Sequence, residues 1–599
     1  MKSFSILASL VTAVIILAHC TGNDQKNLSA TDDIRQSVLA TNKAFNNQLL
    51  HLSQAVSQTA PDAAVQQSFQ ELRRLYKQME WAVAYFMPGT ARFTNGPALD
   101  EIEMEENTVL EAEGLQVLEE KIYPAVDTAD KTEILRMIKK LSNKSQNIDT
   151  YFGVNTISPS QLMDALRNQV FRITTLGITG FDTPVSGTAL TEAQWSLESL
   201  SDLLVRSKDL LKQHAMVDTV CSHIAAAAQV LAVAKDSKDF NYLAFIQTHL
   251  NRISTDVLQL RVKAGIQPVA VTKAVRDDAA TLFEESSFNP DAFVPGSEYK
   301  QTAAKALLGK TLFSDNILSG DGSRSCASCH QASLAFSDGL KAATALKGAP
   351  LLRNTPSLNY SNFQHGQFWD MRRPDLETQA EDVISNKDEM HGSLKNIVAK
   401  LNSDSSYRTR FRTIYKTDSI SNWQVQNVLA AYIRSLSGFQ SDFDRYMRGD
   451  ASAMNAGQQA GFNLFVGKGK CATCHFIPLF NGTVPPEFSK TESEVLGIAN
   501  NFHNKKTDTD PGRGRFHGTV EQLQQAFKTP TLRNISKTAP YMHNGGYQTL
   551  QQVMEFYNEG GGIGLGFKVP NQTLPSDKLN LTKKEMELII QFMGALTDR

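Results

Sequence analysis

The sequence carries Cys-Ala-Ser-Cys-His at residues 326–330 and Cys-Ala-Thr-Cys-His at residues 471–475. The pattern Cys-x-x-Cys-His is the attachment signal of c-type haem: two thiols bind the porphyrin edge covalently, and the adjacent imidazole ligates the iron. A zinc knuckle or a redox dithiol is the alternative interpretation, but a zinc site needs four ligands around one ion, and these pairs lie in separate segments. We therefore predict two covalently bound haems, attached through Cys326, Cys329, Cys471 and Cys474, with His330 and His475 as iron ligands.

The two strings belong to an internal repeat. Leu-Gly-Lys-Thr-Leu-Phe at residues 308–313 precedes the first string, and Gly-Phe-Asn-Leu-Phe at 461–465 precedes the second. Arg-Asn-Thr-Pro-Ser-Leu at 353–358 follows the first, and Thr-Pro-Thr-Leu-Arg-Asn at 529–534 follows the second. Two copies of one unit predict two related domains.

Composition excludes several classes of protein. The chain has 599 residues, of which 41% are apolar and 20% charged, so it can bury large cores and is neither wholly disordered nor fibrous. The formal net charge is −2 and no long Lys/Arg run is present, which argues against nucleic-acid binding through a broad basic face. Six cysteines exclude a disulfide-dense scaffold.

The first half of the chain has helical periodicity. Apolar residues recur at spacings of three and four, as in Leu72, Leu75, Tyr76 and Met79. This pattern predicts an all-helical bundle over residues 28–268. The predicted fold class is therefore mainly α: this N-terminal bundle, then two cytochrome c-like haem domains, which we expect at 283–448 and 449–599.

The N-terminus has the composition of a secretory leader. Lys2 precedes a largely apolar run from Phe4 to Ala18, which is shorter than the roughly 20 residues of a membrane span. We predict a signal peptide at residues 1–20 and export to the periplasm, where c-type haem is attached. The run ends in Leu-Ala-His-Cys and resembles a lipoprotein cleavage box, except that His stands where a small residue is expected. Lipidation of Cys20 as a membrane anchor therefore stays open beside simple cleavage.

From about residue 283 to the C-terminus the chain resembles the bacterial dihaem cytochrome c peroxidase family, which includes the MauG-like enzymes. Met371 stands where this family usually has Gly. Besides the two haem strings, the shared motifs are Ala-Phe-Ser-Asp-Gly at 335–339, Arg-Asn-Thr-Pro at 353–356, Phe-Trp-Asp-Met-Arg at 368–372, Leu-Glu-Thr-Gln at 376–379, Glu-Met at 389–390, Asp-Pro-Gly-Arg at 510–513, Leu-Arg-Asn at 532–534, Pro-Tyr-Met-His-Asn-Gly at 540–545 and Glu-Phe-Tyr-Asn at 555–558.

The resemblance implies roles for three catalytic residues. The haem on His330 is expected to react with hydrogen peroxide. Glu389 matches the distal carboxylate, which can move a proton between the two peroxide oxygens, and Gln379 matches its companion in the pocket. Trp369 matches the indole between the haems, a candidate electron relay. The alternative for Glu389 is a solvated acid in a loop, and the alternative for Trp369 is ordinary packing in the core.

The resemblance also implies a calcium site between the haem domains. Asn354, Thr538 and Pro540 match its residues, the last two through carbonyl oxygens, and hard oxygen ligands suit calcium. Asn and Thr near Pro are also ordinary turn residues, so the sequence leaves both interpretations open.

Two departures from the better-known peroxidases concern the sixth iron ligands. Many members place a distal His shortly after the first string, but residues 331–360 contain none, so we expect an open first haem without reductive activation. His365 and His391 remain as candidate ligands, although a surface position is the usual one for such a His. At the second haem, Tyr557 aligns with the usual Met, as in MauG-like members, and Met554 is the alternative.

A tyrosinate ligand favours oxidised iron and lowers the haem potential. A haem of this kind accepts electrons from a cytochrome poorly but shares oxidising equivalents well. His543 matches a family His near the second haem, and we expect it to lie beside the haem without ligating the iron.

In the N-terminal region, residues 113–120 resemble the Gly-x-His-x-x-Glu string of imelysin-like domains, which are exported helical proteins tied to iron or haem handling. Gln116 replaces the His and puts metal binding there in doubt. Residues 100–120 hold nine acids and no base, which predicts an acidic, solvated helix face, with a cation-binding or partner-docking face as the alternative. Cys221 is expected to be a buried structural thiol.

Three functions are compatible with these features. The prediction is a peroxidase that reduces hydrogen peroxide at the open haem, with electrons relayed through the second haem from a small periplasmic cytochrome c or cupredoxin. The alternative is a MauG-like oxidase that uses high-valent haem iron on an organic or protein substrate. The third is an electron-transfer or iron-acquisition protein, against which Glu389, Gln379 and an unfilled first haem argue. A homodimer is a further candidate assembly.

Overall fold

The computed structural model describes residues 4–103, 106–234, 237–504 and 506–599, with side chains from residue 30 onward. The leader predicted at residues 1–20, including Cys20, lies outside the residues whose side chains are described. The chain is mainly helical, as predicted, and its described residues contain two two-stranded sheets.

The chain folds as two compact units. The first unit comprises Met1–Leu99, Glu111–Asp239 and Ala244–Val271. The second comprises Asp100–Leu110, Phe240–Leu243 and Thr272–Arg599. Two short segments of the N-terminal region thus fold as parts of the second unit, which the sequence boundaries did not anticipate.

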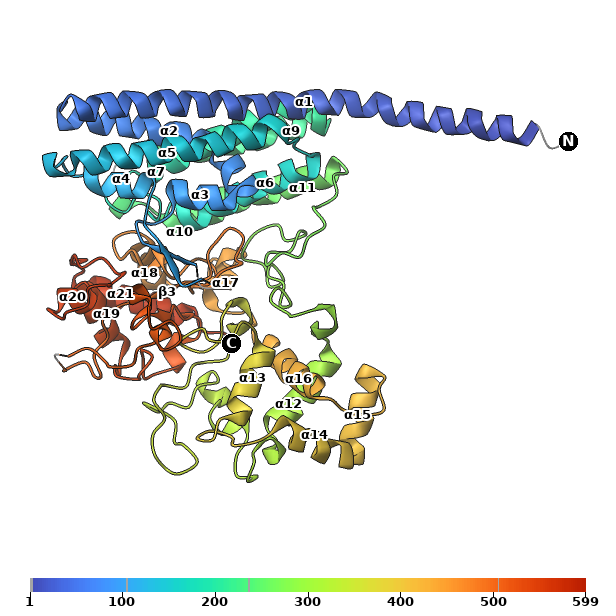
Figure 1. The fold of residues 1–599 in the computed structure, drawn as a ribbon, viewed down its shortest axis with the longest axis vertical. Coiled ribbons are helices and arrows are strands. Elements are labelled where there is room, and N and C mark those ends of the chain that lie inside the picture. The colour runs from blue at the N-terminus through green and yellow to red at the C-terminus, as the bar shows by residue number, and fades with distance from the viewer. Residues whose placement is uncertain (1–3, 104–105, 235–236, 505) are drawn as a thin grey trace. The chain divides into compact units, whose positions relative to one another are not determined.

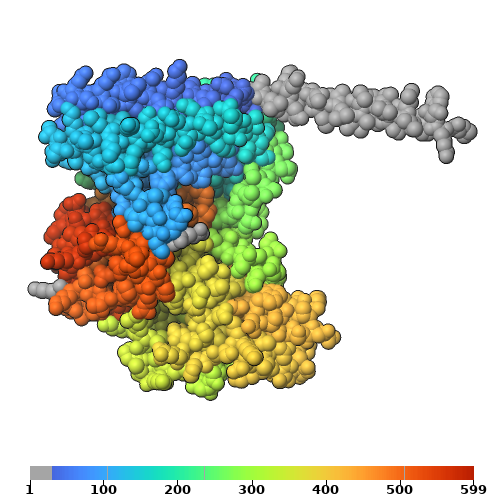
Figure 2. Space-filling view, viewed as in Figure 1, coloured from blue at the N-terminus to red at the C-terminus, as the bar shows by residue number. Residues whose placement is uncertain are grey.

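Long antiparallel helices form the first unit (Figure 1). The apolar stripe Leu72, Leu75, Tyr76 and Met79 is buried, which confirms the helical periodicity. The side chains of α1 and α5 lie along each other in the space-filling view (Figure 2). The helices are α1 (Phe4–Ser57), α2 (Asp62–Phe86), α3 (Pro88–Asn95), α4 (Leu115–Ile122), α5 (Lys131–Val154), α6 (Pro159–Arg172), α7 (Ala189–Arg206), α8 (Lys208–Leu211), α9 (His214–Ala232), α10 (Tyr242–Phe245) and α11 (Asn251–Lys263), with π-helical turns at Ile173–Gly177 and Ile246–Leu250.

Helix α9 is the one described helix whose length and composition would suffice to cross a membrane, and 33% of that stretch is buried in the fold. It packs against α7. Its Cys221 is half-buried rather than fully buried, with Sγ 3.9 Å from the Ser201 carbonyl oxygen.

Charged side chains occupy the centre of the first unit. Lys77 Nζ lies 2.7 Å from Glu80 and 2.6 Å from Asp182, and Arg172 lies 2.8 Å from the same Asp182. All four side chains are less than a tenth exposed. Buried ions of opposite sign that hydrogen-bond one another avoid most of the cost of desolvation.

The imelysin-like string lies beside this centre. The buried Gln116 donates from Nε2 to the Asn95 carbonyl at 3.0 Å, and buried Glu119 accepts from the Ser186 N–H at 2.8 Å. Within the described ranges, no group of three His, Cys, Asp or Glu side chains is arranged to hold a metal ion. Gln116 thus serves the packing of this unit, and the imelysin resemblance stays a prediction.

Residues 100–120 do not form the predicted acidic helix face, so that prediction is wrong. Glu101–Glu103 (β1) and Thr108–Leu110 (β2) pair as an antiparallel hairpin, and helix begins only with α4. Asn107 has a φ of 50°, a turn conformation that Asn adopts readily, and the β-branched residues of β2 favour a strand.

The hairpin folds as part of the second unit. Asn107 Oδ1 lies 2.7 Å from His517 Nδ1, and Gln522 donates to Asp100 at 3.0 Å. Ile102 packs against an apolar cluster made of Val495, Val520, Leu523, Ala526 and Val569. A segment of the N-terminal region therefore completes an apolar core of the second unit.

The second unit contains two helix groups, one around α12–α16 and one around α17–α21 (Figure 1). Each group has one dominant helix pair, α12 with α16 and α18 with α21. The helices are α12 (Ala303–Phe313), α13 (Leu376–Ser385), α14 (Leu394–Ser403), α15 (Ser405–Tyr415), α16 (Asn422–Arg434), α17 (Asp442–Met447), α18 (Ala456–Val466), α19 (Leu550–Asn558), α20 (Gly561–Gly564) and α21 (Lys583–Ala595), and the strands are β3 (Ser493–Glu494) and β4 (Phe527–Lys528).

Both pairs cross at a glycine of the repeated sequence. A Cβ at Gly309 would lie 1.8 Å from the Val428 carbonyl oxygen, and a Cβ at Gly461 would lie 2.0 Å from the Leu588 carbonyl oxygen. Only a residue without a side chain lets the backbones approach this closely. The crossing explains why this glycine recurs in both copies of the repeat.

Gly461→Ala should lower the free energy of unfolding by about 2 kcal/mol or more, because the added methyl group must push α18 away from α21. Chemical denaturation of the haem-loaded protein measures the change. Gly594→Ala in α21 is the matched control, since nothing lies within 4 Å of a Cβ there, and it should be neutral or stabilising by up to about 1 kcal/mol. Equal effects of the two variants would contradict the close crossing.

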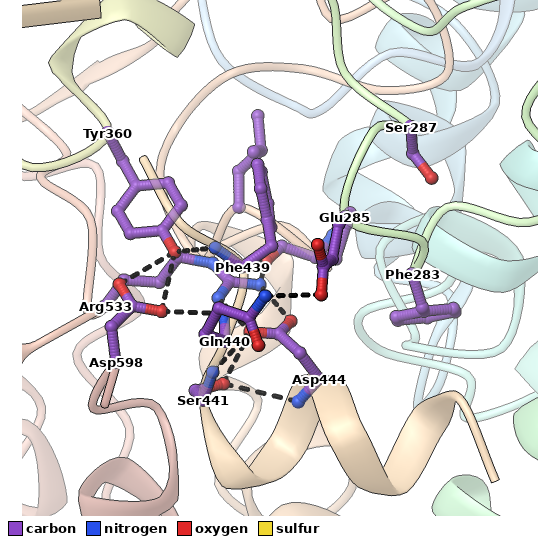
Figure 3. Close-up of polar contacts among 12 residues, drawn as sticks. Phe283, Glu285, Ser287, Tyr360, Phe439, Gln440, Ser441, Asp444, Arg533 and Asp598 are labelled. Atoms are coloured by element: carbon purple, nitrogen blue, oxygen red, sulfur yellow. Dashed lines mark hydrogen bonds and ion pairs between the residues drawn. The ribbon is translucent and has the colours of Figure 1, made fainter. Parts of the chain in front are cut away.

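A buried ion pair joins distant parts of the second unit (Figure 3). Arg533 makes two hydrogen bonds of 2.8 Å to the Asp444 carboxylate, and both side chains are at most 1% exposed. The ring of Tyr360 lies over the guanidinium, and its hydroxyl donates to Asp598 near the C-terminus at 2.8 Å. Segments of both repeats and the chain end thus meet at one charged centre.

Asp444→Asn should destabilise the protein by about 3 kcal/mol or more, because it leaves the Arg533 charge buried without a counter-ion. Asp442→Asn, two residues earlier, removes a partly exposed pair with Arg599 and should cost at most about 1 kcal/mol. Thermal and chemical denaturation of both variants test this; a small effect of Asp444→Asn would show that water reaches Arg533.

Candidate active site

The first haem string forms a tight turn that presents its ligands together. Cys326–Ser328 is a 3-10 turn, and the His330 N–H donates to the Cys326 carbonyl at 2.9 Å. His330 Nδ1 lies 2.8 Å from the Phe336 carbonyl oxygen. A carbonyl only accepts, so Nδ1 carries the proton and Nε2 is left with a lone pair for a metal.

The second string repeats this arrangement. His475 Nδ1 lies 3.2 Å from the Phe480 carbonyl oxygen and 3.1 Å from that of Pro530. The equivalent of Pro530 in the first repeat is Pro356. Its carbonyl hydrogen-bonds His330 and raises the pKa of that histidine, while burial lowers it. Phe336 and Phe480 both have positive φ, 60° and 50°, which turns each carbonyl towards its histidine.

Burial keeps these ligand groups neutral. It lowers the pKa of His330, and it lowers that of His475 to about 4. It raises the pKa of the Cys326 and Cys471 thiols to about 12 each. The described cysteines form no disulfide, and the cysteines and histidines of both strings remain partly open to solvent. Neutral imidazoles with a free Nε2 beside cysteines that form no disulfide fit a covalently bound haem.

The predicted acid–base residue lies beside the first string. Glu389 is half-buried, Asn386 donates to its Oε1 at 2.7 Å, and burial raises its pKa. Burial also raises the pKa of the Cys329 thiol, and the nearby charges of Asp338 and Glu389 raise it further. The Glu389 carboxyl therefore lies near enough to the first haem string to act electrostatically on Cys329.

Gln379 lies on α13 and is half-buried. Two residues earlier, Glu377 forms a buried ion pair with Arg434 of α16 at 2.7 Å, which fixes α13 against the helix pair of the first repeat. His365 and His391 have exposed side chains, the surface position that was the simpler interpretation for both.

Trp369 is bonded to both repeats. Its indole Nε1 donates to the Asn354 carbonyl at 2.9 Å, and its own carbonyl accepts from the Lys528 N–H at 2.8 Å. Asn354 and Lys528 occupy equivalent positions in the two repeats, because each lies two residues before a proline, Pro356 or Pro530. The carbonyl of each proline hydrogen-bonds the histidine of its repeat. A short bonded path thus joins the two histidines through the tryptophan.

A charged layer surrounds this link. Arg353 bonds Asp510 at 2.6 Å and Asp370 at 2.5 Å. His543 stacks on Phe527 with ring centroids 3.7 Å apart, and its buried Nε2 lies 3.6 Å from Asp508 Oδ2. Its position beside the second haem stays a prediction.

Tyr557 and Met554, the two ligand candidates for the second haem, both lie on α19 (Leu550–Asn558). Burial raises the pKa of the Tyr557 hydroxyl, and the charges of Cys474 and Cys471 raise it further, so the phenol lies near the second string. Met554 is buried one turn earlier on α19. The ligand assignment itself stays a prediction.

Glu494 is a residue beside the second string that sequence reasoning missed. Burial raises its pKa to about 7, Thr573 Oγ1 donates to its Oε2, and the Cys474 thiol hydrogen-bonds it. Its position on β3 brings it to the second string. No motif in the sequence marks it.

The proposed calcium residues lie on neighbouring segments. The Asn354 N–H donates to the His543 carbonyl at 2.8 Å, three residues beyond Pro540. Asn354 Nδ2 donates to the Leu340 carbonyl at 2.9 Å, and Thr538 Oγ1 donates to the Ile535 carbonyl. These bonds suit a packed turn as well as a cation, and calcium stays a prediction.

The repeated helix pairs and histidine sites define a c-type cytochrome with two haem sites. A family model described as di-haem cytochrome c peroxidase matches residues 303–452. The methylamine utilization protein MauG of Methylorubrum extorquens is 33% identical over 330 residues, 55% of this chain and 87% of the relative. The cytochrome c551 peroxidase of Nitrosomonas europaea is 34% identical over 303 residues, 50% of this chain and 81% of the relative.

A crystal structure of a MauG-like protein associated with microbial copper homeostasis aligns with a TM-score of 0.44 at 28% identity, over 51% of this chain and 94% of that one.

The chain belongs to the dihaem cytochrome c peroxidase family, in which MauG-type proteins also occur. It is an oxidoreductase of the cytochrome c peroxidase type, which uses peroxide as electron acceptor, and the family implies two c-type haems. These findings confirm the family and the class of enzyme, and they support the prediction of two c-type haems.

Tyr557→Met should raise the potential of the second haem by on the order of 100 mV, because axial ligands move haem potentials over about 0.8 V and Met raises them. Spectroelectrochemical titration measures the shift. Met554→Leu is the control and should leave the potential in place. If Met554→Leu shifts the potential and Tyr557→Met does not, Met554 is the ligand.

Proposed function

We propose that this protein reduces hydrogen peroxide at the His330 haem, with electrons passed through Trp369 from the His475 haem and supplied by a small cytochrome c or cupredoxin. The observation that carries the proposal is the hydrogen bonding of Trp369 to equivalent positions of both repeats. It gives electrons a short bonded route between the two haem sites.

Haem, when bound to the two strings, supplies the redox-active iron that peroxide reduction requires. Glu389 takes a proton from one peroxide oxygen and delivers it to the other, which leaves as water. Burial, which raises the pKa of this carboxyl, suits a group that must both accept and release a proton. Asn386 fixes its orientation through the bond of 2.7 Å to Oε1. Gln379 of α13 is the companion residue that orients the peroxide.

A MauG-like oxidation of an organic or protein substrate is the second candidate. The placement of Tyr557 beside the Cys471 and Cys474 thiols supports it, because an anionic ligand would favour the storage of oxidising equivalents. Turnover of peroxide with a reduced cytochrome, compared with peroxide consumption without one, separates the two candidates.

Three further assignments belong to the proposal. Residues 1–20 act as an export leader, so the mature protein is periplasmic, and lipidation of Cys20 would anchor it to a membrane. Asn354, Thr538 and Pro540 hold calcium between the repeats, which metal analysis of the purified protein tests. A homodimer is tested by its mass in solution.

Glu389→Gln should lower peroxide turnover by at least about 100-fold, because the amide cannot carry a proton between the two oxygens. The matched control is Asp388→Asn, the exposed neighbouring acid, which should keep full turnover. Haem content and absorption spectra establish that both variants are loaded. Near-normal turnover of a loaded Glu389→Gln protein would remove the proposed acid–base role.

A further inference from the structure

A buried phenol of the second unit is hydrogen-bonded to a carboxylate and to a backbone N–H (Figure 3). The Tyr360 hydroxyl lies 2.8 Å from Asp598 Oδ2 and 3.0 Å from Asp598 Oδ1, so it donates to that carboxylate. The same oxygen accepts from the Phe439 N–H at 2.8 Å. Because Tyr360 is 0% exposed, the carboxylate rather than solvent faces the phenolic proton.

Further hydrogen bonds fix Asp598, which is itself half-buried. Its carboxylate accepts from the Gln440 N–H and from Asn534 Nδ2, both at 3.0 Å, and its own N–H donates to Asn534 Oδ1 at 2.8 Å. A carboxylate that is already held at hydrogen-bond distance can take a proton without rearrangement. Asp598 is therefore a proton acceptor in place for the phenol of Tyr360.

The cation beside this phenol is neutralised by its own partner. Arg533 Cζ lies 4.8 Å from the centroid of the Tyr360 ring, but Asp444 holds Arg533 through two hydrogen bonds of 2.8 Å. Loss of an electron alone from Tyr360 would leave a new positive charge in a buried place, which is costly. If the proton moves to Asp598 in the same step, the ring and the acid are both left neutral, so the pair favours loss of the electron and the proton together.

Tyr360 is connected to the segments that hold both haem-string histidines. It lies four residues after Pro356, whose carbonyl hydrogen-bonds the histidine of the first string. Arg533, which lies over the Tyr360 ring, is also 5.7 Å from the ring centroid of Phe480. The Phe480 carbonyl oxygen lies 3.2 Å from Nδ1 of the histidine of the second string. Short stretches of packed chain therefore join the phenol to both candidate haem sites.

We propose that Tyr360 is a redox-active residue that lends one electron to peroxide reduction. Hydrogen peroxide takes up two electrons and two protons and gives two water molecules, whereas a small cytochrome or cupredoxin delivers one electron at a time. When the donor has supplied only one, Tyr360 gives the other, and its hydroxyl proton passes to Asp598, which leaves a neutral tyrosyl radical and a protonated acid. The next donor electron and the proton on Asp598 restore the phenol. The inference rests on the proposed reaction with peroxide and does not require Trp369.

The test is freeze-quench EPR of the haem-loaded protein, reduced by one electron and then mixed with one equivalent of hydrogen peroxide. Protein grown on ring-deuterated tyrosine identifies the radical, because the label narrows a tyrosyl signal and leaves an indole signal unchanged. The variants are Tyr360→Phe and Asp598→Asn. Tyr407→Phe is the matched control: Tyr407 also donates to a carboxylate, that of Asp315, but lies on α15 rather than on a segment that hydrogen-bonds a haem-string histidine.

We expect a tyrosyl signal in the wild type and in Tyr407→Phe that decays when reduced cytochrome c is added, and no such signal in Tyr360→Phe. Asp598→Asn should lower its yield at least about tenfold, because the amide cannot take the proton, and this variant keeps the test valid if Tyr360→Phe does not fold. If peroxide is consumed without a tyrosyl signal, or the signal persists in loaded Tyr360→Phe or Asp598→Asn, this inference is overturned and the proposed function stands. A loaded protein that does not react with peroxide would overturn both.

Discussion

In each haem repeat a backbone carbonyl accepts the Nδ1 proton of the histidine, and the surrounding structure serves that hydrogen bond. Phe336 and Phe480 adopt left-handed conformations to present their carbonyls. Ser357 and Thr531 support these turns by donating to the carbonyls just before them, those of Ala335 and Leu479. The bond directs Nε2 towards the crevice, where only a neutral imidazole can ligate iron.

The segments that orient the two histidines also join the two repeats. The backbones of Asn354 and Lys528, two residues before Pro356 and Pro530, hydrogen-bond Trp369. The segments that orient the histidines therefore also hold the tryptophan. Charges then organise the region around this link, with Arg353 between the carboxylates of Asp370 and Asp510. Positioning of the ligands, the relay and the acid–base group thus depends on one continuous set of loops.

Much of this arrangement was predictable from the sequence, because covalent haem attachment needs a fixed string and helices need a periodic one. The haem strings, the mainly helical fold and the family could all be inferred in this way. Glu494 could not be placed beside the second string, since its position comes from loops that bring distant segments together. The hairpin of β1 and β2 was also missed, because nine acids and no base over residues 100–120 suggest a solvated helix face when the turn at Asn107 is not considered.

The central claim is that peroxide reaches an open haem iron on His330 in the fully oxidised protein. The most direct measurement is the absorption and EPR spectrum of the haem-loaded ferric protein, before and after one equivalent of hydrogen peroxide. The account predicts one high-spin, five-coordinate haem that reacts at once, because residues 331–360 contain no histidine to close the site. Two low-spin haems that react only after one-electron reduction would contradict it.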